Sequence, residues 1–336
     1  MGASIIEGTK AAPTCWGDVL ILGLGKSGKA AASYCLNLLG GRVKSVTIAA
    51  GEKNDAALEF AARCEALGAH VVFDMYTFKD TYDVCTVSPG ISQFSRFYEN
   101  AKAASTEVIS EVEFAWRESP ADSRWVAVTG TNGKTTTTSL ITHILKCAGE
   151  RVAAVGNIGE TCIDAVAAGN TDVYVAETSS YQLASTRLFA PDVAVVLNIT
   201  PDHLSWHGSL EAYAAAKWKV LANLGVSGGV AVLDACDDAV RAKIRELRAR
   251  GGVPFRYIPI GGAFGLGADM RATCGTGAAA FRGDGGQLVV AWDGRVSDLV
   301  FVDDLQIKGG HNQQNALAAA ACALVLGATD TAVGEG

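Results

Sequence analysis

The sequence lacks the features that mark membrane, secreted and nucleic-acid-binding proteins. No apolar run reaches the roughly 20 residues that a membrane-spanning helix needs, and no charged leader with a long apolar region opens the chain. Charged residues make up only 19% of the 336 residues, and the formal charge is -7. A general nucleic-acid binder carries a basic excess instead. We therefore expect no secretion, no membrane insertion and no nucleic-acid partner.

The nine cysteines lack the C-x-x-C pairs that zinc and redox sites use. Their number is odd and they are scattered from Cys15 to Cys322. We expect reduced, mostly buried thiols and a cytoplasmic location. The chain also lacks internal repeats and a low-complexity tail.

The length allows about two domains, each with its own core. Hydrophobic residues make up 49%, and 38 glycines are present, which favours buried parallel sheets. The fold class we expect is α/β. The polar stretch 117–123 predicts the boundary between an N-terminal Rossmann-like domain, residues 1–118, and a central P-loop-type ATPase domain with a mostly parallel sheet, residues 119–336.

The first segment opens with a strand at 18–22, a Gly23-Leu24-Gly25-Lys26-Ser27-Gly28 turn and an alanine-rich helix to about residue 39. A lone G-x-G-x-x-G first suggests NAD. The acid expected after the second strand is missing, however, because that strand runs into Ala49-Ala50-Gly51. The pattern favours a phosphate or nucleotide-linked ligand, and purely structural glycines are the alternative. The other elements expected are strands at 43–48, 71–73 and 84–87 and a helix at 56–67.

The most informative stretch reads as a strand, a glycine loop, a lysine and a helix start. Gly130 and Gly133 would let backbone N–H groups converge on phosphate oxygens. Lys134 would neutralise the β- and γ-phosphates, and Thr135 would place its hydroxyl on Mg²⁺. The strict pattern would put the first glycine at Val128, so this is a variant phosphate loop. The alternative, a Gly-Lys-Thr that only opens a helix, fits badly with four successive threonines.

Polar residues follow four apolar runs of the second segment, where each predicted strand ends. Such ends meet at one edge of an open α/β sheet, so we expect these residues to converge on the phosphate loop. Beside phosphates the carboxylate of Glu177 is useful as an Mg²⁺ ligand, and an exposed acid in an N-cap or salt bridge is the alternative. Beyond them we expect shorter strands at 228–233, 255–259 and 287–292, and helices at 237–250 and from about 310 to 326. The four runs end in Thr129-Gly130, Gly156-Asn157, Glu177-Thr178-Ser179-Ser180 and Asn198-Ile199-Thr200-Pro201-Asp202-His203.

His203 and His207 have the i, i+4 spacing that suggests a zinc hydrolase. No H-E-x-x-H accompanies them, and Pro201 and Gly208 leave little room for a helix. We therefore leave His207 unassigned as a structural histidine, whereas His203 stays a candidate through its position at a strand end.

Lys217 is an unusual residue for its position. Helical spacing from Leu210 places it in one apolar row with Tyr213 and Leu221. Desolvation there would lower the pKa of the amine and make it nucleophilic, or else the group must be paired or modified. The alternative is a lysine that snorkels to the surface.

Together these motifs resemble the Mur ligase family, ATP-dependent enzymes that join amino acids to the peptidoglycan precursor. Within it the chain is most similar to members that add D-glutamate to UDP-N-acetylmuramoyl-L-alanine, through the 23–28 turn, the Ser88-Pro89-Gly90-Ile91 loop and Trp206-His207-Gly208. A third, C-terminal domain that supplies the amino-acid site is not evident before Gly336, so we expect little ligase activity from this chain alone. The other motifs that carry the resemblance are residues 129–135, 157–159, 177–183, 198–204, 214–217 and 311–315.

The resemblance implies a role for each candidate residue. The reaction would pass through an acyl phosphate in peptidoglycan precursor synthesis, with ATP, Mg²⁺ and a carbamylated Lys217. Another Mur or folylpolyglutamate-type ligase, or a non-catalytic nucleotide-binding module, is the alternative. The UDP substrate would contact Gly25, Lys26, Ser27, Ser88, Pro89, Gly90, Asn157, Ser179 and Gln182. ATP would contact Gly130, Thr131, Asn132, Gly133, Lys134, Thr135, Thr136 and, at the adenine, Asn312. Metal ligands would be Thr135 and Glu177 for one ion and His203 and the Lys217 carbamate for another, and the catalytic set would be Lys134, Glu177, His203, Lys217 and Asn157.

Overall fold

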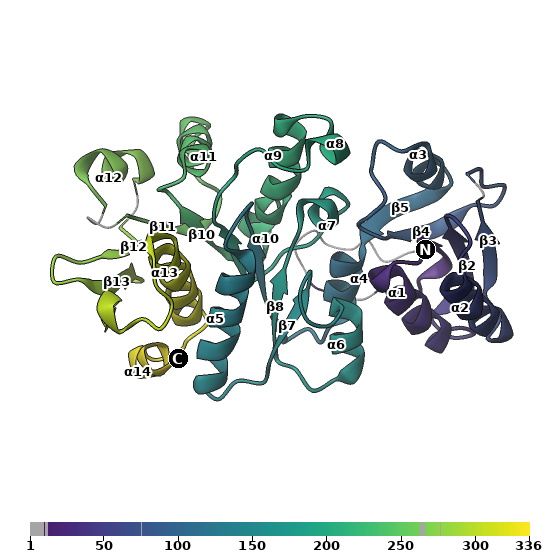
Figure 1. Ribbon diagram of the computed structural model, residues 1–336, viewed down its shortest axis with the longest axis horizontal. Helices are drawn as coiled ribbons and strands as arrows, with labels where there is room; N and C mark the ends of the chain where they lie inside the picture. The colour runs from purple at the N-terminus through teal and green to yellow at the C-terminus, as the bar shows by residue number, and fades with distance from the viewer. Residues whose placement is uncertain (1–9, 11–12, 75, 263–265, 276) are drawn as a thin grey trace.

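The computed structural model describes residues 10, 13–74, 76–262, 266–275 and 277–336. Within these residues a five-stranded sheet and a nine-stranded sheet lie side by side along the long axis of the molecule, each flanked by helices (Figure 1). The predicted α/β class is therefore confirmed. We call the part around the first sheet the first lobe and the part around the second sheet the second lobe.

The first lobe is a parallel sheet in the order β3-β2-β1-β4-β5. This is the Rossmann order without its sixth strand, and it places the turn after β1 at the crevice where the strand order reverses. The strands are β1 Gly17–Leu22, β2 Val43–Ala50, β3 His70–Phe73, β4 Tyr82–Val87 and β5 Ser105–Ser110. The helices are α1 Lys26–Asn37, α2 Asp55–Ala66, α3 Arg96–Ala103 and α4 Glu111–Glu118.

The second lobe is a mixed sheet in the order β14-β13-β12-β11-β10-β9-β6-β8-β7. The pairs from β7 to β12 are parallel, and only the β12–β13 and β13–β14 pairs are antiparallel. The predicted, mostly parallel sheet is confirmed. Its strands are β6 Arg124–Thr129, β7 Val152–Gly156, β8 Val173–Glu177, β9 Val193–Val196, β10 Val230–Asp234, β11 Arg256–Ile260, β12 Ala279–Arg282, β13 Gln287–Trp292 and β14 Arg295–Phe301.

Helices α5 and α13 lie next to each other against the second sheet (Figure 1). Residues 316–323 of α13 are buried, and six of them are alanines, whose small side chains let the helix approach the sheet closely. The helices of this lobe are α5 Lys134–Cys147, α6 Cys162–Ala168, α7 Ser180–Ala184, α8 Leu204–His207, α9 Leu210–Trp218, α10 Leu224–Ser227, α11 Asp238–Ala249, α12 Ala268–Cys274, α13 Gly310–Val325 and α14 Asp330–Glu335, with 3₁₀ turns at Lys219–Leu221 and Val302–Asp304.

A shared aromatic core joins the two lobes. Trp116 of α4 meets Phe189 edge to face, with ring centroids 5.9 Å apart, and Trp125 of β6 stacks on Tyr174 at 4.7 Å. Both tryptophans are at most 1% exposed. A single hydrophobic cluster thus runs from one sheet to the other and fixes the groups that face each other across the junction.

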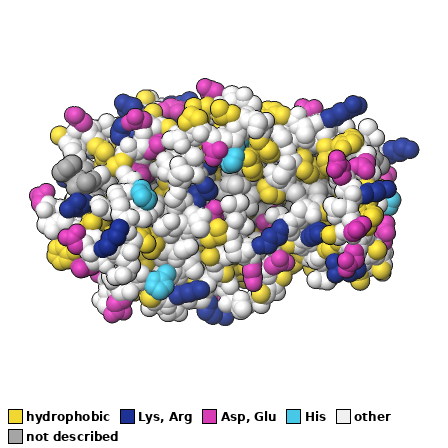
Figure 2. All heavy atoms as spheres, in the orientation of Figure 1, with side chains coloured by type: hydrophobic (Ala, Val, Ile, Leu, Met, Phe, Trp, Pro, Cys, Tyr) yellow, Lys and Arg dark blue, Asp and Glu magenta, His cyan; other side chains and the backbone are white. Residues whose placement is uncertain are grey.

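The helices, the charged surface and the cysteines fit what the amino-acid composition predicts. In the part of the chain that the structure describes, no helix is long and apolar enough to cross a membrane. On the face drawn in Figure 2 the basic and acidic side chains are interspersed. All nine cysteines are free thiols and six are buried, as predicted.

Candidate active site

The phosphate loop connects β6, the third strand from the β7 edge of the second sheet, to α5. Gly133 adopts a left-handed backbone, φ 83°, and a Cβ there would lie 2.6 Å from Oδ1 of Asn315. At Gly130 a Cβ would lie 3.0 Å from the Cβ of Leu197. Both predicted glycines are therefore required by the loop, which leads directly into the amino end of a 14-residue helix, where anions bind.

Asn198, at the end of β9, holds the loop in place. Its Oδ1 accepts the Asn132 N–H at 2.8 Å, and its Nδ2 donates to the Asn132 carbonyl at 3.1 Å. Its own carbonyl accepts the Thr131 N–H at 2.8 Å. The loop is thus preformed by the neighbouring strand, a role that the sequence did not reveal because it depends on contacts across strands.

Glu177, at the end of β8, joins two other candidates. Its Oε2 accepts the Thr135 hydroxyl at 2.8 Å, and its Oε1 accepts the Asn157 side-chain amide at 2.8 Å. The side chain is 2% exposed, and no lysine or arginine among the described residues forms an ion pair with it. A buried carboxylate held only by neutral donors fits a divalent cation, because a cation would supply the missing charge.

Two lysines converge on one carbonyl oxygen of the loop. Nζ of Lys134 donates to the Gly130 carbonyl at 3.0 Å, and Nζ of Lys217 donates to the same carbonyl at 2.7 Å. Burial, and then the nearby Lys134 charge, lowers the pKa of Lys217 to about 7. Burial also lowers the pKa of Lys134. An anion at the loop would relieve the repulsion between the two ammonium groups.

Lys217 lies on the buried side of α9, as predicted. It is 2% exposed, and its Nζ lies 4.7 Å from the centre of the Tyr213 ring. The Tyr213 hydroxyl in turn lies 3.0 Å from Oγ1 of Thr131 in the phosphate loop. The snorkelling alternative is therefore wrong for the position of this side chain.

The two histidines occupy different environments. His203 has a left-handed backbone, φ 51°, which costs a non-glycine residue about 1–2 kcal/mol. Its ring is half exposed and lies 3.4 Å from the Asp202 carboxylate. His207 is 1% exposed, and its Nε2 shares a 2.8 Å hydrogen bond with the Ser180 hydroxyl. Burial, followed by the Lys217 charge, lowers the pKa of His207 to about 4, so this ring is neutral.

The zinc interpretation gains no support from this arrangement. Among the described residues no group of three or more histidine, cysteine, aspartate or glutamate side chains is placed to hold a metal ion. The position of Glu177 beside Thr135 suits a hard cation with oxygen ligands and water instead.

A cleft of about 470 Å³ lies between the lobes. The cleft brings together the first-lobe candidates with Asn157 and Gln182 of the second lobe. Ser179 does not line it, because its hydroxyl caps α7 and its backbone N–H donates to Oε1 of Gln182 at 2.9 Å. Lys26 spans the lobes, with its Nζ 2.5 Å from the Gly159 carbonyl oxygen. The first-lobe candidates in the cleft are Gly25, Lys26, Ser27, Ser88, Pro89 and Gly90.

Asn312 lies in the first turn of α13 and is linked to the helix that follows the phosphate loop. Its Oδ1 accepts from Nδ2 of Asn315 at 3.0 Å, and Oδ1 of Asn315 accepts the Thr137 hydroxyl at 3.2 Å. Thr136 is half-buried in the first turn of α5. Asn315 is a further site residue that the sequence analysis did not single out, although it lies in the same polar run as Asn312.

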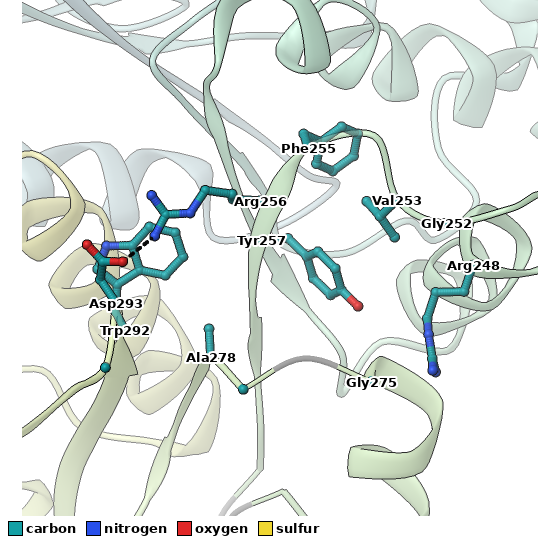
Figure 3. A pocket seen from close by; sticks show the side chains of 12 residues that line it. Arg248, Gly252, Val253, Phe255, Arg256, Tyr257, Gly275, Ala278, Trp292 and Asp293 are labelled. Atoms are coloured by element: carbon teal, nitrogen blue, oxygen red, sulfur yellow. Dashed lines mark hydrogen bonds and ion pairs between the residues drawn. The ribbon is translucent and has the colours of Figure 1, made fainter.

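A larger hollow, of about 610 Å³, lies away from these residues, between the start of β11 and the end of β13 (Figure 3). There Arg256 stacks on Trp292, with its guanidinium carbon 4.0 Å from the ring centre, and pairs with Asp293 at 2.9 Å. Arg248 donates to carbonyls at the end of α12. These charged groups already have partners, and no predicted site residue lines the hollow.

The fold and the site define a two-lobed α/β protein with a phosphate loop and an adjoining interlobe cleft. The chain belongs to the Mur ligase family, since residues 128–323 match the model of the Mur ligase middle domain.

Curated relatives are similar in sequence to most of this chain. The UDP-N-acetylmuramoylalanine--D-glutamate ligase of Thermobifida fusca (strain YX) is 35% identical over 326 residues, 95% of this chain and 66% of the relative. The ligase of the same name from Streptomyces avermitilis is 38% identical over 323 residues, again 95% of this chain and 66% of the relative. The chain thus spans just under two thirds of the length of these relatives.

Solved structures agree on the fold. A UDP-N-acetylmuramate:L-alanyl-gamma-D-glutamyl-meso-diaminopimelate ligase from Neisseria meningitides aligns with a TM-score of 0.54 at 18% identity, covering 96% of this chain and 97% of that one. A murein peptide ligase from Psychrobacter arcticus 273-4 aligns with a TM-score of 0.52 at 17% identity, covering 95% of this chain and 67% of that one.

Proposed function

We propose that this chain forms the UDP-binding domain (residues 1–118) and the ATP-binding domain (residues 119–336) of a UDP-N-acetylmuramoylalanine–D-glutamate ligase. The observation that carries the proposal is the position of Asn157. Its side chain lines the interlobe cleft and also donates to Glu177, which accepts the hydroxyl of Thr135 behind the phosphate loop. A substrate carboxylate and a terminal phosphate would therefore meet at one place. The names and 35–38% identities of the relatives support the choice of acceptor.

The reaction would proceed in two steps. A carboxylate oxygen of UDP-N-acetylmuramoyl-L-alanine attacks the γ-phosphorus of ATP, and the bond from that phosphorus to the bridging oxygen breaks, which releases ADP and leaves an acyl phosphate. The amine of D-glutamate then attacks the acyl carbon, and phosphate departs with the carboxylate oxygen while the amine loses its proton. The loop N–H groups and the ammonium of Lys134 would hold the phosphates in line and stabilise their charge.

The residues around the phosphate loop fit a phosphoryl transfer that a metal ion assists. Mg²⁺, when bound, would offset the charge of the phosphates and polarise the transferring group. Thr135 and Glu177 would hold one ion, and His203 with a carbamate on Lys217 would hold a second. Such a carbamate forms when the neutral amine adds to CO₂ and loses a proton. The burial of Lys217, which lowers its pKa, supports this modification because it favours the neutral amine.

The remaining assignments follow from the same proposal. Gly25, Lys26, Ser27 and the Ser88–Gly90 loop would bind the UDP group, and Asn312 would contact the adenine. Ser179 and Gln182 would act near the muramoyl-alanine end, Ser179 through its cap on α7. The product belongs to peptidoglycan precursor synthesis, and hence to cell-wall growth and division, in the cytoplasm.

The test uses UDP-N-acetylmuramoyl-L-alanine, D-glutamate and ATP with the full-length enzyme that contains this chain. We expect amide formation that depends on all three. No product should form when UDP-N-acetylmuramate replaces UDP-N-acetylmuramoyl-L-alanine and L-alanine replaces D-glutamate. The 336-residue chain alone should bind ATP with Mg²⁺ in a calorimetric titration but form little amide, because it spans only 66% of the length of its ligase relatives. Robust amide formation by the chain alone would contradict the expected low ligase activity of this chain. Preference for L-alanine would contradict the choice of D-glutamate as the amino acid that is added.

A further inference from the structure

A buried hydrogen bond links the two segments that carry Glu177 and His203. It joins Oγ of Ser180 and Nε2 of His207 at 2.8 Å, and the two residues are 2% and 1% exposed. Ser180 comes three residues after Glu177, at the start of α7. His207 comes four residues after His203, and the backbone N–H of His207 donates to the His203 carbonyl at 3.2 Å.

An aromatic stack packs around the same bond. The ring of Tyr181 lies 4.9 Å from His203, 4.5 Å from Trp206 and 5.6 Å from His207, measured between ring centroids. Tyr213, whose ring contacts Nζ of Lys217, meets His207 edge on at 5.3 Å. The ring of His207 is therefore in contact with groups on both α7 and α9.

The backbone of His203 needs such support. Its left-handed conformation is unfavourable for a residue with a Cβ, and it persists only where the surroundings hold it. The turn of α8 supplies that support, since the N–H groups of Trp206 and His207 both donate to the His203 carbonyl. Within the described residues, Nδ1 of His207 is buried without a partner, so Nε2 is the ring atom that anchors the turn to α7.

We propose that Ser180 and His207 are a positioning pair that fixes the separation between Glu177 and His203, and thereby the distance between the two metal sites. Neither residue touches the substrate. The pair acts through the turn of α8, whose N–H groups at Trp206 and His207 donate to the His203 carbonyl. The proposal rests on the proposed function, which gives Glu177 and His203 their roles as metal ligands.

The test titrates the chain with Mn²⁺ in the presence of β,γ-imido-ATP and bicarbonate, with free Mn²⁺ followed by electron paramagnetic resonance. We expect the wild-type chain to bind two ions. His207→Phe keeps the aromatic packing but removes the hydrogen bond, and Ser180→Ala removes it from the other side. Each substitution should weaken the binding of one ion about tenfold and leave the affinity for the other ion unchanged. The double variant should bind the weakened ion no less tightly than either single variant does.

Two further variants separate positioning from simple loss of stability. His207→Gln retains a hydrogen-bonding group and should restore much of the weakened affinity. Ser185→Ala, at the C-cap of the same short helix, should leave the binding of both ions unchanged. If His207→Phe fails to fold, Ser180→Ala and its comparison with Ser185→Ala still decide the question.

Three results would contradict the proposed positioning role of Ser180 and His207. Folded variants that bind both ions as the wild type does would show that the bond positions nothing. Additive effects of the two substitutions would show that the residues act separately. A wild-type chain that binds no Mn²⁺ with the nucleotide would contradict the proposed function itself, and the pair with it.

Discussion

The side-chain amide of Asn157 donates a 2.8 Å hydrogen bond to the carboxylate of Glu177. Asn157 belongs to the loop after β7 and lines the interlobe cleft, whereas Glu177 ends β8 beside the phosphate loop. The interlobe cleft and the surroundings of the phosphate loop are therefore connected through one pair of side chains. Chemistry between a ligand in the cleft and a phosphate on the loop needs this proximity.

Lys134→Ala should reduce turnover of the full-length enzyme by on the order of 100-fold or more, because the ammonium stabilises charge on the transferring phosphate. The fold should persist, since the lysine contributes charge rather than packing. Steady-state kinetics and thermal unfolding measure the two effects. Lys146→Ala, at the exposed end of the same helix, is the matched control and should change neither. An unfolded Lys134 variant, or one with normal turnover, would contradict the assignment.

Lys217→Ala should abolish activity of the full-length enzyme, and short carboxylic acids such as acetate should restore part of it by occupying the place of the carbamate. ¹³C-labelled bicarbonate should label Lys217 in the wild type. Lys219→Ala is the comparison, because its ammonium bonds carbonyls at the end of α7 rather than the phosphate loop. Acetate should not rescue that variant. A fully active Lys217→Ala enzyme together with an unlabelled lysine would eliminate the carbamate.

Gly90→Ala should weaken binding of a UDP-sugar about tenfold, as one added methyl group in a fitted pocket can do. A Cβ at Gly90 would meet no atom of the chain within 4 Å, so the methyl group would occupy the cleft without straining the fold. Calorimetric titration with a UDP-sugar and with NAD measures the effect and the preference. Gly41→Ala, outside the cleft, should bind normally. Tight NAD binding by the wild type would reverse the ligand assignment.

Glu111 predicts a pH dependence of stability that is independent of the active site. Burial raises its pKa from 4.5 to about 7, although the Ile163 N–H donates to it at 2.7 Å. Between these values the folded state binds the extra proton, so the free energy of unfolding should fall as pH rises, by at most about 1.4 kcal/mol per pH unit.

The variant Glu111→Gln isolates this contribution, because it stays neutral while keeping an acceptor for the same N–H. Denaturant unfolding should show the wild type losing stability relative to the variant from about pH 4.5 to about pH 7, with a constant difference at higher pH. The exposed Glu65→Gln should show no such trend. A difference that does not change with pH would mean that Glu111 is already ionised in the folded chain.

The elements with strong hydrophobic patterns could be predicted from the sequence. The strand of the phosphate loop and the buried face of α9 at Lys217 both lie where the apolar spacing places them. Strands β5, β12 and β14 were not predicted. β14 has one fully buried position and alternates irregularly, because it pairs with β13 at the edge of the sheet, and an edge strand carries a weak pattern.

Contacts between segments that are distant in the chain could not be predicted from the sequence. The anchoring of Asn132 by Asn198 spans 66 residues, and the Ser180–His207 bond spans 27. Both depend on the order in which parallel strands assemble, which local periodicity does not encode. Ser179 and Gln182 form a capping box at the start of α7, and their contacts with substrate stay a prediction.

The most direct test of the ligase proposal follows the oxygen atoms of the substrate. Full-length enzyme should be supplied with UDP-N-acetylmuramoyl-L-alanine that carries ¹⁸O in the alanyl carboxylate, together with ATP and D-glutamate, and the released phosphate analysed by mass spectrometry. We predict one ¹⁸O atom in each phosphate, because the attacking carboxylate oxygen leaves with the phosphoryl group. Amide formation with unlabelled phosphate would contradict the acyl-phosphate route.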